Sequence, residues 1–143
     1  MKLNSKLHYA IKTLVCIAIY ANENGITQKE IALKMNFSYK FLDHVMTALK
    51  VAGIVHKLPG RLKGYVLTKD PHNITIYQVY KAFEPELGVF PCVTGNIDCT
   101  HSTECATHSF FCDLNQNIIL KLESTTIGQL KESQLDCTTK EPL

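Results

Sequence analysis

The sequence predicts a mainly α-helical protein with one small β-hairpin. Apolar residues recur at helical spacing through most of residues 5–50, two short runs typical of strands flank a turn at residues 59–64, and a long apolar stripe returns after residue 106. The chain has 143 residues, which is enough for one domain with an appended helix and a core of its own.

Three helices are predicted in the first half of the chain, each bounded by a capping side chain or a glycine. They cover residues 5–22, residues 28–35, and the segment between Ser38 and Gly53. The second helix begins with a capping box, because Glu30 follows Thr27 by three residues. A tight turn joins the second helix to the third, so this pair is predicted to form a helix-turn-helix.

A basic β-hairpin is predicted directly after the third helix. Its strands are expected at residues 54–58 and 65–67, on either side of Pro59-Gly60-Arg61-Leu62-Lys63-Gly64. A helix-turn-helix followed by a basic hairpin is the order of a winged helix, in which the wing lays Arg or Lys along DNA phosphates. Residues 1–73 are therefore predicted to form a winged helix-turn-helix DNA-binding domain.

The predicted DNA-contacting residues are polar side chains of the helix-turn-helix and the wing. The third helix buries one face and leaves the other free to reach phosphates or base edges. The candidates are Thr27, Ser38, Tyr39, Lys40, Asp43, His44, Lys50, Arg61 and Lys63. A helical hairpin on the surface of a bundle is the alternative explanation of these helices, and the basic hairpin that follows argues against it.

Charge is unevenly distributed along the chain. Residues 1–70 carry eleven Lys and Arg against four Asp and Glu, a net charge of +7, whereas residues 71–143 carry four against nine, a net charge of −5. This asymmetry indicates that the first half meets a polyanion such as DNA. Two ordinary solvated surfaces would explain the charge alone equally well.

The second half is predicted to hold a cysteine loop and dimerisation helices over residues 74–133, followed by a flexible tail at residues 134–143. Helices are expected from about 75 to 83, 106 to 123 and 127 to 133, with a long irregular loop over 86–105. The longest carries an apolar stripe that an isolated helix cannot bury: Phe111, Leu114, Ile118 and Leu122. This long C-terminal dimerisation helix is expected to pack on a second copy, on the first helix of its own chain, or on both.

Cellular location follows from what the sequence lacks. No stretch approaches the roughly 20 apolar residues of a membrane-spanning helix, and no cleavable signal peptide is evident. The chain is expected to be cytoplasmic, with no membrane partner. Six cysteines in a reducing compartment indicate metal or redox chemistry rather than a disulfide scaffold.

Three cysteines in the irregular loop form the strongest candidate metal site. Cys92, Cys99 and Cys105 are separated by six and five residues. Thiolates this close together are typical ligands of a soft metal or an iron–sulfur cluster. The loop lacks the C-x-x-C pairs of structural zinc sites, which weakens the interpretation as zinc.

The fourth ligand is left open by the residues alone. His108 lies three residues after Cys105, where a helix begins, so both can face one point. Cys112 lies one turn further along and is a weaker candidate. His8, on the first helix, becomes a candidate if a second subunit brings it near. Catalysis is not predicted, because the chain has no nucleophile–base pair at motif spacing and no phosphate-binding glycine loop.

Taken together, these features resemble the IscR/NsrR/CymR family of bacterial regulators, the Rrf-two family. The resemblance runs from Met1 to about Glu132. It is carried by the opening Met1-Lys2-Leu3-Asn4-Ser5-Lys6, the segment Ser38 to Leu42, Gly64-Tyr65-Val66-Leu67, the cysteine triplet, and Thr126-Ile127-Gly128-Gln129-Leu130. No single motif is decisive, but their combination in this order is specific.

The resemblance implies a homodimer in which long C-terminal helices join two winged heads. It also implies that members with three cysteines bind a 2Fe-2S or 4Fe-4S iron–sulfur cluster. In some members the fourth ligand is a histidine at the position of His108, and in others it is an acid at the position of His8. The wing departs from the family pattern, because Pro59 replaces an arginine and two glycines are absent, so phosphate contact is expected rather than minor-groove insertion.

The function predicted is that of a dimeric DNA-binding transcriptional regulator, expected to be a repressor. An iron–sulfur cluster would control its affinity for operator DNA and sense nitric oxide, redox state or cluster supply, and Ala82-Phe83-Glu84-Pro85 resembles the nitric-oxide-responsive branch. One alternative is a zinc- or thiol-based transcriptional regulator without a cluster. The alternative from another class is an iron–sulfur electron-transfer protein.

Overall fold

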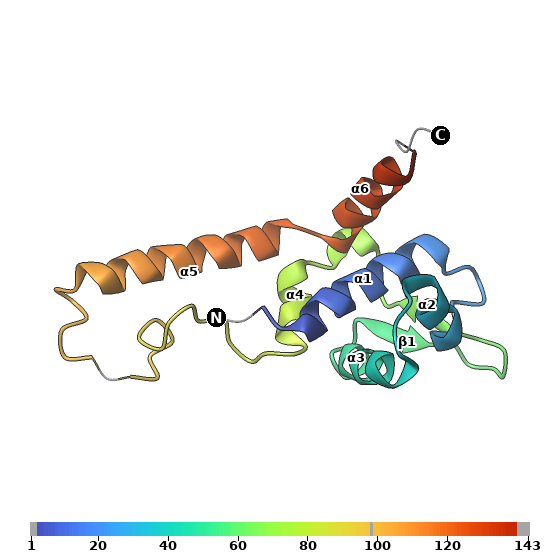
Figure 1. The fold of residues 1–143 in the computed structure, drawn as a ribbon, viewed down its shortest axis with the longest axis horizontal. Helices are drawn as coiled ribbons and strands as arrows, with labels where there is room; N and C mark the ends of the chain where they lie inside the picture. Colours follow the sequence, from blue (N-terminus) through green and yellow to red (C-terminus); the bar gives the residue numbers. More distant parts are fainter. Residues whose placement is uncertain (1–2, 98, 140–143) are drawn as a thin grey trace.

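A computed structural model describes residues 3–97 and 99–139 as a winged head with a projecting helical arm (Figure 1). The elements in order are α1 (Ser5–Tyr20), α2 (Gln28–Met35), α3 (Tyr39–Val51), β1 (Val55–Lys57), β2 (Tyr65–Leu67), the 3-10 turn η1 (Pro71–Asn73), α4 (Ile76–Lys81), α5 (Ala106–Ser124) and α6 (Ile127–Thr139). The predicted fold class, mainly helical with one small hairpin, is confirmed.

The helix α1 lies at the centre of the head. Its buried face, which includes Leu14 and Ile17, packs against α2, α3, β2, α4 and α6. From the other side α3 contributes Leu42 and Leu49, both fully buried. Replacing one such leucine by alanine typically costs about 2–5 kcal/mol, a large part of the roughly 5–15 kcal/mol that holds a domain folded. This shared core therefore fixes α3 relative to the rest of the head.

The wing is a two-stranded antiparallel hairpin that the α1–α2 loop extends. Val55 pairs with Leu67, and Lys57 pairs with Tyr65. Ile26 forms a bridge to the other edge of β2, where its N–H donates to the Tyr65 carbonyl at 3.0 Å and its carbonyl accepts the Tyr65 N–H at 2.7 Å. Tyr65 at the base of the wing thus pairs with Lys57 of β1 on one side and with Ile26 of the α1–α2 loop on the other.

A backbone joint connects the head to the C-terminal arm. Thr75 and Thr126 form an antiparallel bridge, and each is the capping residue of the helix that follows it, α4 and α6. The Ile76 N–H donates to the Thr125 carbonyl and the Ile127 N–H donates to the Ile74 carbonyl, both at 2.9 Å. The segment that begins and ends at this joint comprises α4, which packs on the head, followed by the arm, which is the cysteine loop and α5.

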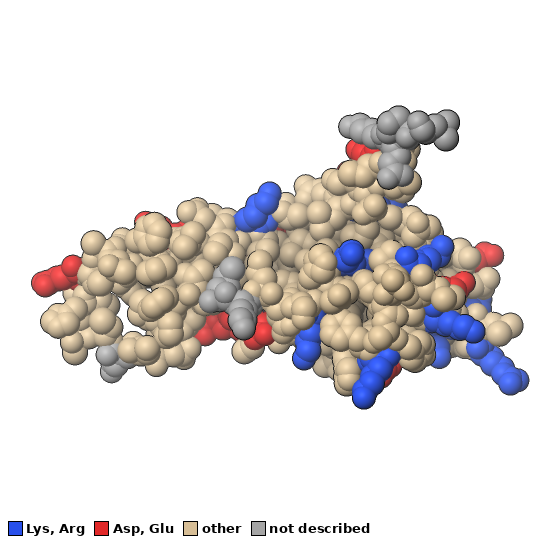
Figure 2. Space-filling view, viewed as in Figure 1, with Lys and Arg blue, Asp and Glu red and all other residues tan. Residues whose placement is uncertain are grey.

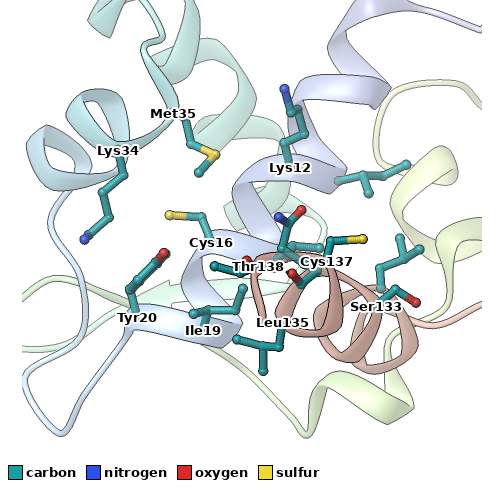
Figure 3. Close-up of a pocket in the computed structure, with 14 residues that line it drawn as sticks. Lys12, Cys16, Ile19, Tyr20, Lys34, Met35, Ser133, Leu135, Cys137 and Thr138 are labelled. Carbon is teal, nitrogen blue, oxygen red and sulfur yellow. Dashed lines mark hydrogen bonds between the residues drawn. The ribbon is translucent and has the colours of Figure 1, made fainter. Parts of the chain in front are cut away.

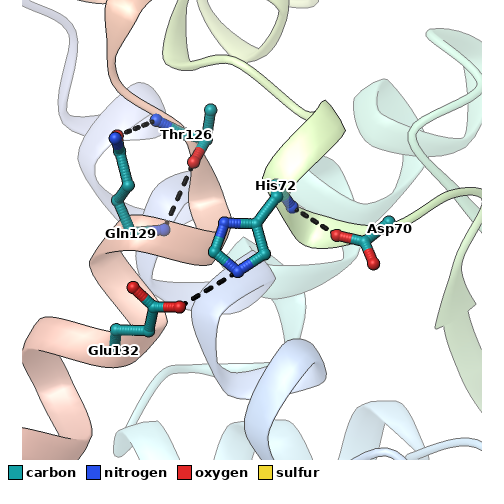
Figure 4. A network of polar contacts seen from close by, with 5 residues as sticks. All are labelled: Asp70, His72, Thr126, Gln129 and Glu132. Carbon is teal, nitrogen blue, oxygen red and sulfur yellow. Dashed lines mark hydrogen bonds and ion pairs between the residues drawn. The ribbon is translucent and has the colours of Figure 1, made fainter.

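Side chains reinforce the joint from outside (Figure 4). His72 Nε2 lies 3.1 Å from Glu132 Oε1 on α6, and the His72 N–H donates to Asp70 Oδ1 at 2.8 Å. Gly128 packs directly under the His72 ring, since a Cβ added there would meet the ring at 2.5 Å. The first turn of α6 therefore packs closely against η1.

The arm itself is covered over only part of its length. Ile118, Ile119 and Leu122 of α5 pack against the core, whereas Phe110 is 61% exposed and Leu120 is 51% exposed. The chain itself thus covers part of the predicted stripe. None of the helices described, including this one, is both long and apolar enough to cross a membrane.

Two predicted helix ends need correction. The first helix ends at Tyr20 rather than near residue 22, because Ala21 is extended and Asn22 already pairs with Gly25. The last helix continues to Thr139, so residues 134–139, expected in the flexible tail, are helical. Residues 134–139 are all exposed, and the extra turns are bonded locally, since the Thr138 hydroxyl donates to the Gln134 carbonyl at 2.9 Å and the Thr139 hydroxyl to the Leu135 carbonyl at 3.3 Å. Residues 140–143 of that tail, and Met1 and Lys2, lie outside the described residues.

Candidate DNA-binding surface and cysteine loop

The outer face of α3 carries the predicted base-reading and phosphate-binding side chains. Five of them are exposed: Tyr39, Lys40, Asp43, His44 and Lys50. The opposite face of the helix is buried through Leu42, Val45, Met46 and Leu49. Lys and Arg gather over the head in Figure 2, whereas the arm shows mainly scattered acidic side chains. The charge asymmetry of the sequence is therefore a spatial asymmetry of the molecule.

Two polar contacts set the direction of α3. Ser38 caps the helix, since its hydroxyl accepts the Phe41 N–H at 3.2 Å. Gln28, which is only 8% exposed at the start of α2, donates from its side-chain amide to Asp43 Oδ1 at 3.2 Å. Asp43 is thus engaged in joining the two helices of the helix-turn-helix.

The capping box predicted at Thr27 is present. The Thr27 N–H and hydroxyl both donate to Glu30 Oε2 at 2.7 Å, and the Thr27 hydroxyl accepts the Glu30 N–H at 3.2 Å. These hydrogen bonds from Thr27, first from its backbone and then from its side chain, lower the pKa of Glu30. The backbone N–H groups of Thr27 and Glu30 at the start of α2 therefore both have hydrogen-bond partners.

The wing residues face in different directions. Arg61 is exposed, but Lys63 is half-buried and donates from its ammonium group to the Asn24 side chain. Leu62, between them, is 88% exposed. Lys57 on β1 is exposed as well, and sequence reasoning assigned a role to neither Leu62 nor Lys57.

Three of the predicted or candidate ligands lie in the first turns of α5, in two separate contacts. Cys105 caps the helix, because its Sγ accepts the His108 N–H at 3.4 Å. One turn on, Cys112 Sγ lies 3.5 Å from His108 Nε2. The other ring nitrogen, Nδ1 of His108, is buried and has no hydrogen-bond partner among the described residues. A buried polar atom without a partner is a suitable ligand atom.

The beginning of the cysteine loop is fastened to α5. The Val89 N–H donates to Asn115 Oδ1 at 3.0 Å, and the Phe90 ring stacks on Phe111 with centroids 4.9 Å apart. Asn115 is only 8% exposed. Sequence reasoning missed it, although a polar residue one turn after Phe111 on the apolar face was the signal. This contact directs the loop back along α5.

The remaining ligand candidates are not brought together. Cys92 is half-buried and Cys99 is exposed. Across residues 3–97 and 99–139, no three His, Cys, Asp or Glu side chains converge closely enough to hold a metal ion. His8 is exposed on α1 beside Tyr9, and Figure 1 shows the start of α1 well separated from the start of α5. Within one chain, His8 is therefore not part of this site.

A helix-turn-helix with an exposed polar α3, a hairpin beside it and basic charge over both defines a winged helix-turn-helix protein. The family described as "Rrf2: Iron-dependent Transcriptional regulator" matches residues 3–133. The chain therefore belongs to the Rrf2 family of transcriptional regulators. The resemblance drawn from the motifs is confirmed, and the relatives are named as regulators, not as enzymes.

Individual relatives agree with this assignment. The chain is 32% identical over 130 residues to the HTH-type transcriptional regulator IscR of Vibrio campbellii, and the match covers 91% of this chain and 77% of that protein. CymR (YrzC), the global cysteine regulator of B. subtilis, has the same fold with a TM-score of 0.78 at 23% identity, over 93% of this chain and 98% of that one. T. potens IscR gives a TM-score of 0.75 at 22% identity, over 100% and 93% of the two chains.

Proposed function

We propose that this chain binds operator DNA as a homodimer, with α3 of each copy in the major groove and the wing against phosphates. The observation that carries this proposal is the exposed polar face of α3 on the basic head. Helix-turn-helix dimers place their recognition helices about 34–36 Å apart, or a multiple of that spacing. The arm is the part of the chain suited to setting this distance, because α5 projects from the head with Phe110 and Leu120 exposed.

A DNA titration tests this function. Fluorescence anisotropy with genomic operator fragments should show an affinity that falls steeply with salt, because Lys and Arg release counterions from phosphates. Lys40→Ala should weaken binding about three- to tenfold and lower the salt slope by about 1. The matched control is Lys121→Ala on α5, which should bind as the unmodified chain does. An affinity that does not vary with salt, or an unchanged Lys40→Ala variant, would contradict the proposal.

We further infer that the regulator is controlled by an iron–sulfur cluster held by Cys92, Cys99, Cys105 and His108. The chemistry of the donors fits, since three thiols and an imidazole with a free buried Nδ1 are soft ligands. The iron dependence in the family's description supports the same ligand class. A bound cluster would supply a centre sensitive to oxidants or nitric oxide. His8 of a second copy is the competing fourth ligand.

The proposed regulation works through the residues that border the cysteine loop. Cys105 and His108 form the first turn of α5, so ligation would fix that turn, and the contacts of Val89 and Phe90 would transmit the constraint along the arm. Loss of ligation would free the turn and alter the spacing of the two heads. The chain is proposed to act as a repressor in the cytoplasm, responding to nitric oxide, redox state or cluster supply.

An absorption spectrum of protein purified without oxygen tests the cluster. Iron, sulfide and visible absorption bands should be present and should change when nitric oxide is added. Cys99→Ser should abolish the bands and His108→Ala should weaken or shift them, whereas Cys137→Ser on α6 is the control and should retain them. A colourless protein with one zinc per chain would overturn the cluster in favour of a zinc regulator.

A thiol-based regulator is the second candidate, and one contact favours it. Cys112 Sγ lies beside His108 Nε2 at 3.5 Å, and a neighbouring imidazole activates a thiol for oxidation. A metal-free protein whose DNA affinity changes with Cys112 oxidation would establish this candidate. An electron-transfer protein would instead show the cluster without operator binding.

A further inference from the structure

A groove of about 730 Å³ lies beside α1, with walls from α1, the end of α2 and α6 (Figure 3). No residue of α3, of the wing or of the cysteine loop lines it. Small-molecule sites typically measure about 300–1,000 Å³ and are apolar with a few polar groups. The groove therefore has the size of a ligand site separate from both functional surfaces already described.

The floor of the groove is apolar. It is formed by side chains that are buried or half-buried: Ile11, Val15, Cys16, Ile19, Met35 and Leu130. Burial raises the pKa of the Cys16 thiol to about 11, with Lys34 acting weakly in the opposite direction. The thiol is therefore neutral at neutral pH and forms part of the apolar wall rather than a nucleophile.

Two lysines stand at the rim. The Lys34 ammonium lies 4.0 Å from the centroid of the Tyr20 ring, and the Lys12 ammonium lies 5.9 Å from the centroid of Phe37. Both side chains are exposed. Contact with aromatic faces holds a cation in place without neutralising it. The positive charges are thus positioned beside the apolar floor.

No carboxylate forms an ion pair with either lysine within the described residues. The lining contains two lysines and neither Asp nor Glu. Glu30, one turn before Lys34, makes its hydrogen bonds to Thr27 and interacts with Lys34 only through the charge, as the last of the causes that shift the pKa of Glu30. The ion pair found in the described part of the chain is the distant His72–Glu132 contact. An apolar groove with positive charge at its rim is complementary to an anion that has an apolar body.

We propose that the groove binds a small amphipathic anion, an aliphatic carboxylate whose chain lies on the apolar floor and whose carboxylate pairs with Lys34. Lys12 adds attraction from the other side of the rim. Lys34 lies in the last turn of α2, next to the turn that leads into α3, while the opposite wall belongs to α6. The ligand would therefore bridge α6 to the helix-turn-helix and provide an input independent of the cysteine loop.

Calorimetric titration of the full-length protein with sodium octanoate tests the site. We expect saturable binding of one octanoate per chain, and weaker binding of the uncharged analogue octan-1-ol. Lys34→Gln should weaken octanoate binding about tenfold and Lys12→Gln should weaken it less, because each loses a charged partner. Lys29→Gln, on the exposed face of α2 outside the groove, is the matched control and should bind normally. Thermal unfolding without ligand shows whether each variant is folded.

Three results would overturn the proposal. They are the absence of saturable binding, equal affinity for octanol and octanoate, and full affinity in the folded Lys34→Gln variant. Light scattering in the same samples identifies the other possible occupant. If octanoate converts dimers to single chains, the groove is an interface with a second copy and not a ligand site.

Discussion

Thr27 and Ser38 are predicted DNA contacts, yet each hydroxyl already accepts a backbone N–H within its own helix. A capping hydroxyl still has a hydrogen to donate, and Ser38 can offer it to a phosphate oxygen. The Thr27 hydroxyl instead donates to Glu30. The Ser38 hydroxyl therefore keeps a hydrogen that it can donate to DNA, whereas the Thr27 hydroxyl already donates its hydrogen to Glu30.

Thr27→Ala should lower the free energy of unfolding by about 1 kcal/mol, as loss of a helix cap typically does. Hydrogen bonds from the Thr27 backbone N–H and then from its hydroxyl lower the pKa of Glu30, and alanine removes only the second. The contribution of the hydroxyl is present above the ordinary pKa of a glutamate and is lost as the pH falls through the lowered pKa in the folded state. The loss should therefore be smaller at about pH 3 than at about pH 7 in urea titrations.

The control for this measurement is Thr47→Ala. Thr47 is exposed on α3, and its hydroxyl donates to the Asp43 carbonyl within the helix. Alanine at such a site should leave the stability unchanged or slightly raised, and without the pH dependence. An equal loss of unfolding free energy in Thr27→Ala and Thr47→Ala would show that the capping box does not stabilise the fold.

Residues with local roles were predictable, and those with distant partners were not. The capping box of Thr27 and Glu30 follows from three-residue spacing alone. The contact of Asn115 with the Val89 N–H joins residues far apart in sequence, and so does the contact of Lys63 with Asn24. Such pairs depend on tertiary packing, which a single sequence does not record.

Between elements, two backbones approach each other closely at the base of the wing. A Cβ added to Gly64 would lie 2.2 Å from the carbonyl carbon of Ile26, and the Gly64 N–H donates to the Asn24 carbonyl at 2.8 Å. No side chain fits between the wing and the α1–α2 loop. This glycine is therefore required by contact between elements, and not by the turn itself.

Gly64→Ala should lower the free energy of unfolding by about 1–3 kcal/mol, because the hairpin must move away from Ile26. The same displacement shifts Arg61, so affinity for DNA should fall as well. Gly53→Asn is the matched control: Gly53 has φ +71° with nothing near its added Cβ, and asparagine tolerates that conformation. Denaturant titrations should give a clearly lower free energy of unfolding for Gly64→Ala than for Gly53→Asn. Similar free energies in the two variants would contradict the close contact between Gly64 and Ile26.

Helix ends show how elements depend on their neighbours. The start of α5 was predictable because Cys105 and His108 mark it, whereas α6 exceeds its predicted end at Ser133 by six residues. The polar composition after Ser133 indicates fraying when it is considered alone. Hydrogen bonds within α6, from the hydroxyls of Thr138 and Thr139 to carbonyls one turn earlier, accompany the extra turns.

For the whole molecule, the exposed apolar residues of the arm bear on how copies of the chain assemble. Phe110 and Leu114 lie one turn apart on the part of α5 that projects from the head, and they are 61% and 38% exposed. Neighbouring apolar residues of this kind on a projecting helix indicate contact with another protein surface. A second copy, related by two-fold symmetry, would bring the same stripe to meet itself.

The double variant Phe110→Asp/Leu114→Asp should convert the predicted dimer to single chains, because two carboxylates would face their counterparts across the interface. Light scattering coupled to size-exclusion chromatography measures the mass. Leu62→Asp, at the 88% exposed wing tip, is the control and should remain dimeric. A double variant that keeps the mass of two chains would move the interface away from this part of α5.

The Thr75–Thr126 joint makes the arm an insertion whose two ends coincide. The cost of closing such an insertion grows by only about 0.6 kcal/mol for each doubling of its length, so its length and ligands can change while the head keeps its fold. A single chain break after the exposed Glu104, made at an inserted recognition site for a sequence-specific protease, should therefore leave both fragments bound to each other. They should elute together under native conditions and separate in urea, because α5 and α6 of the C-terminal fragment pack on the core of the head.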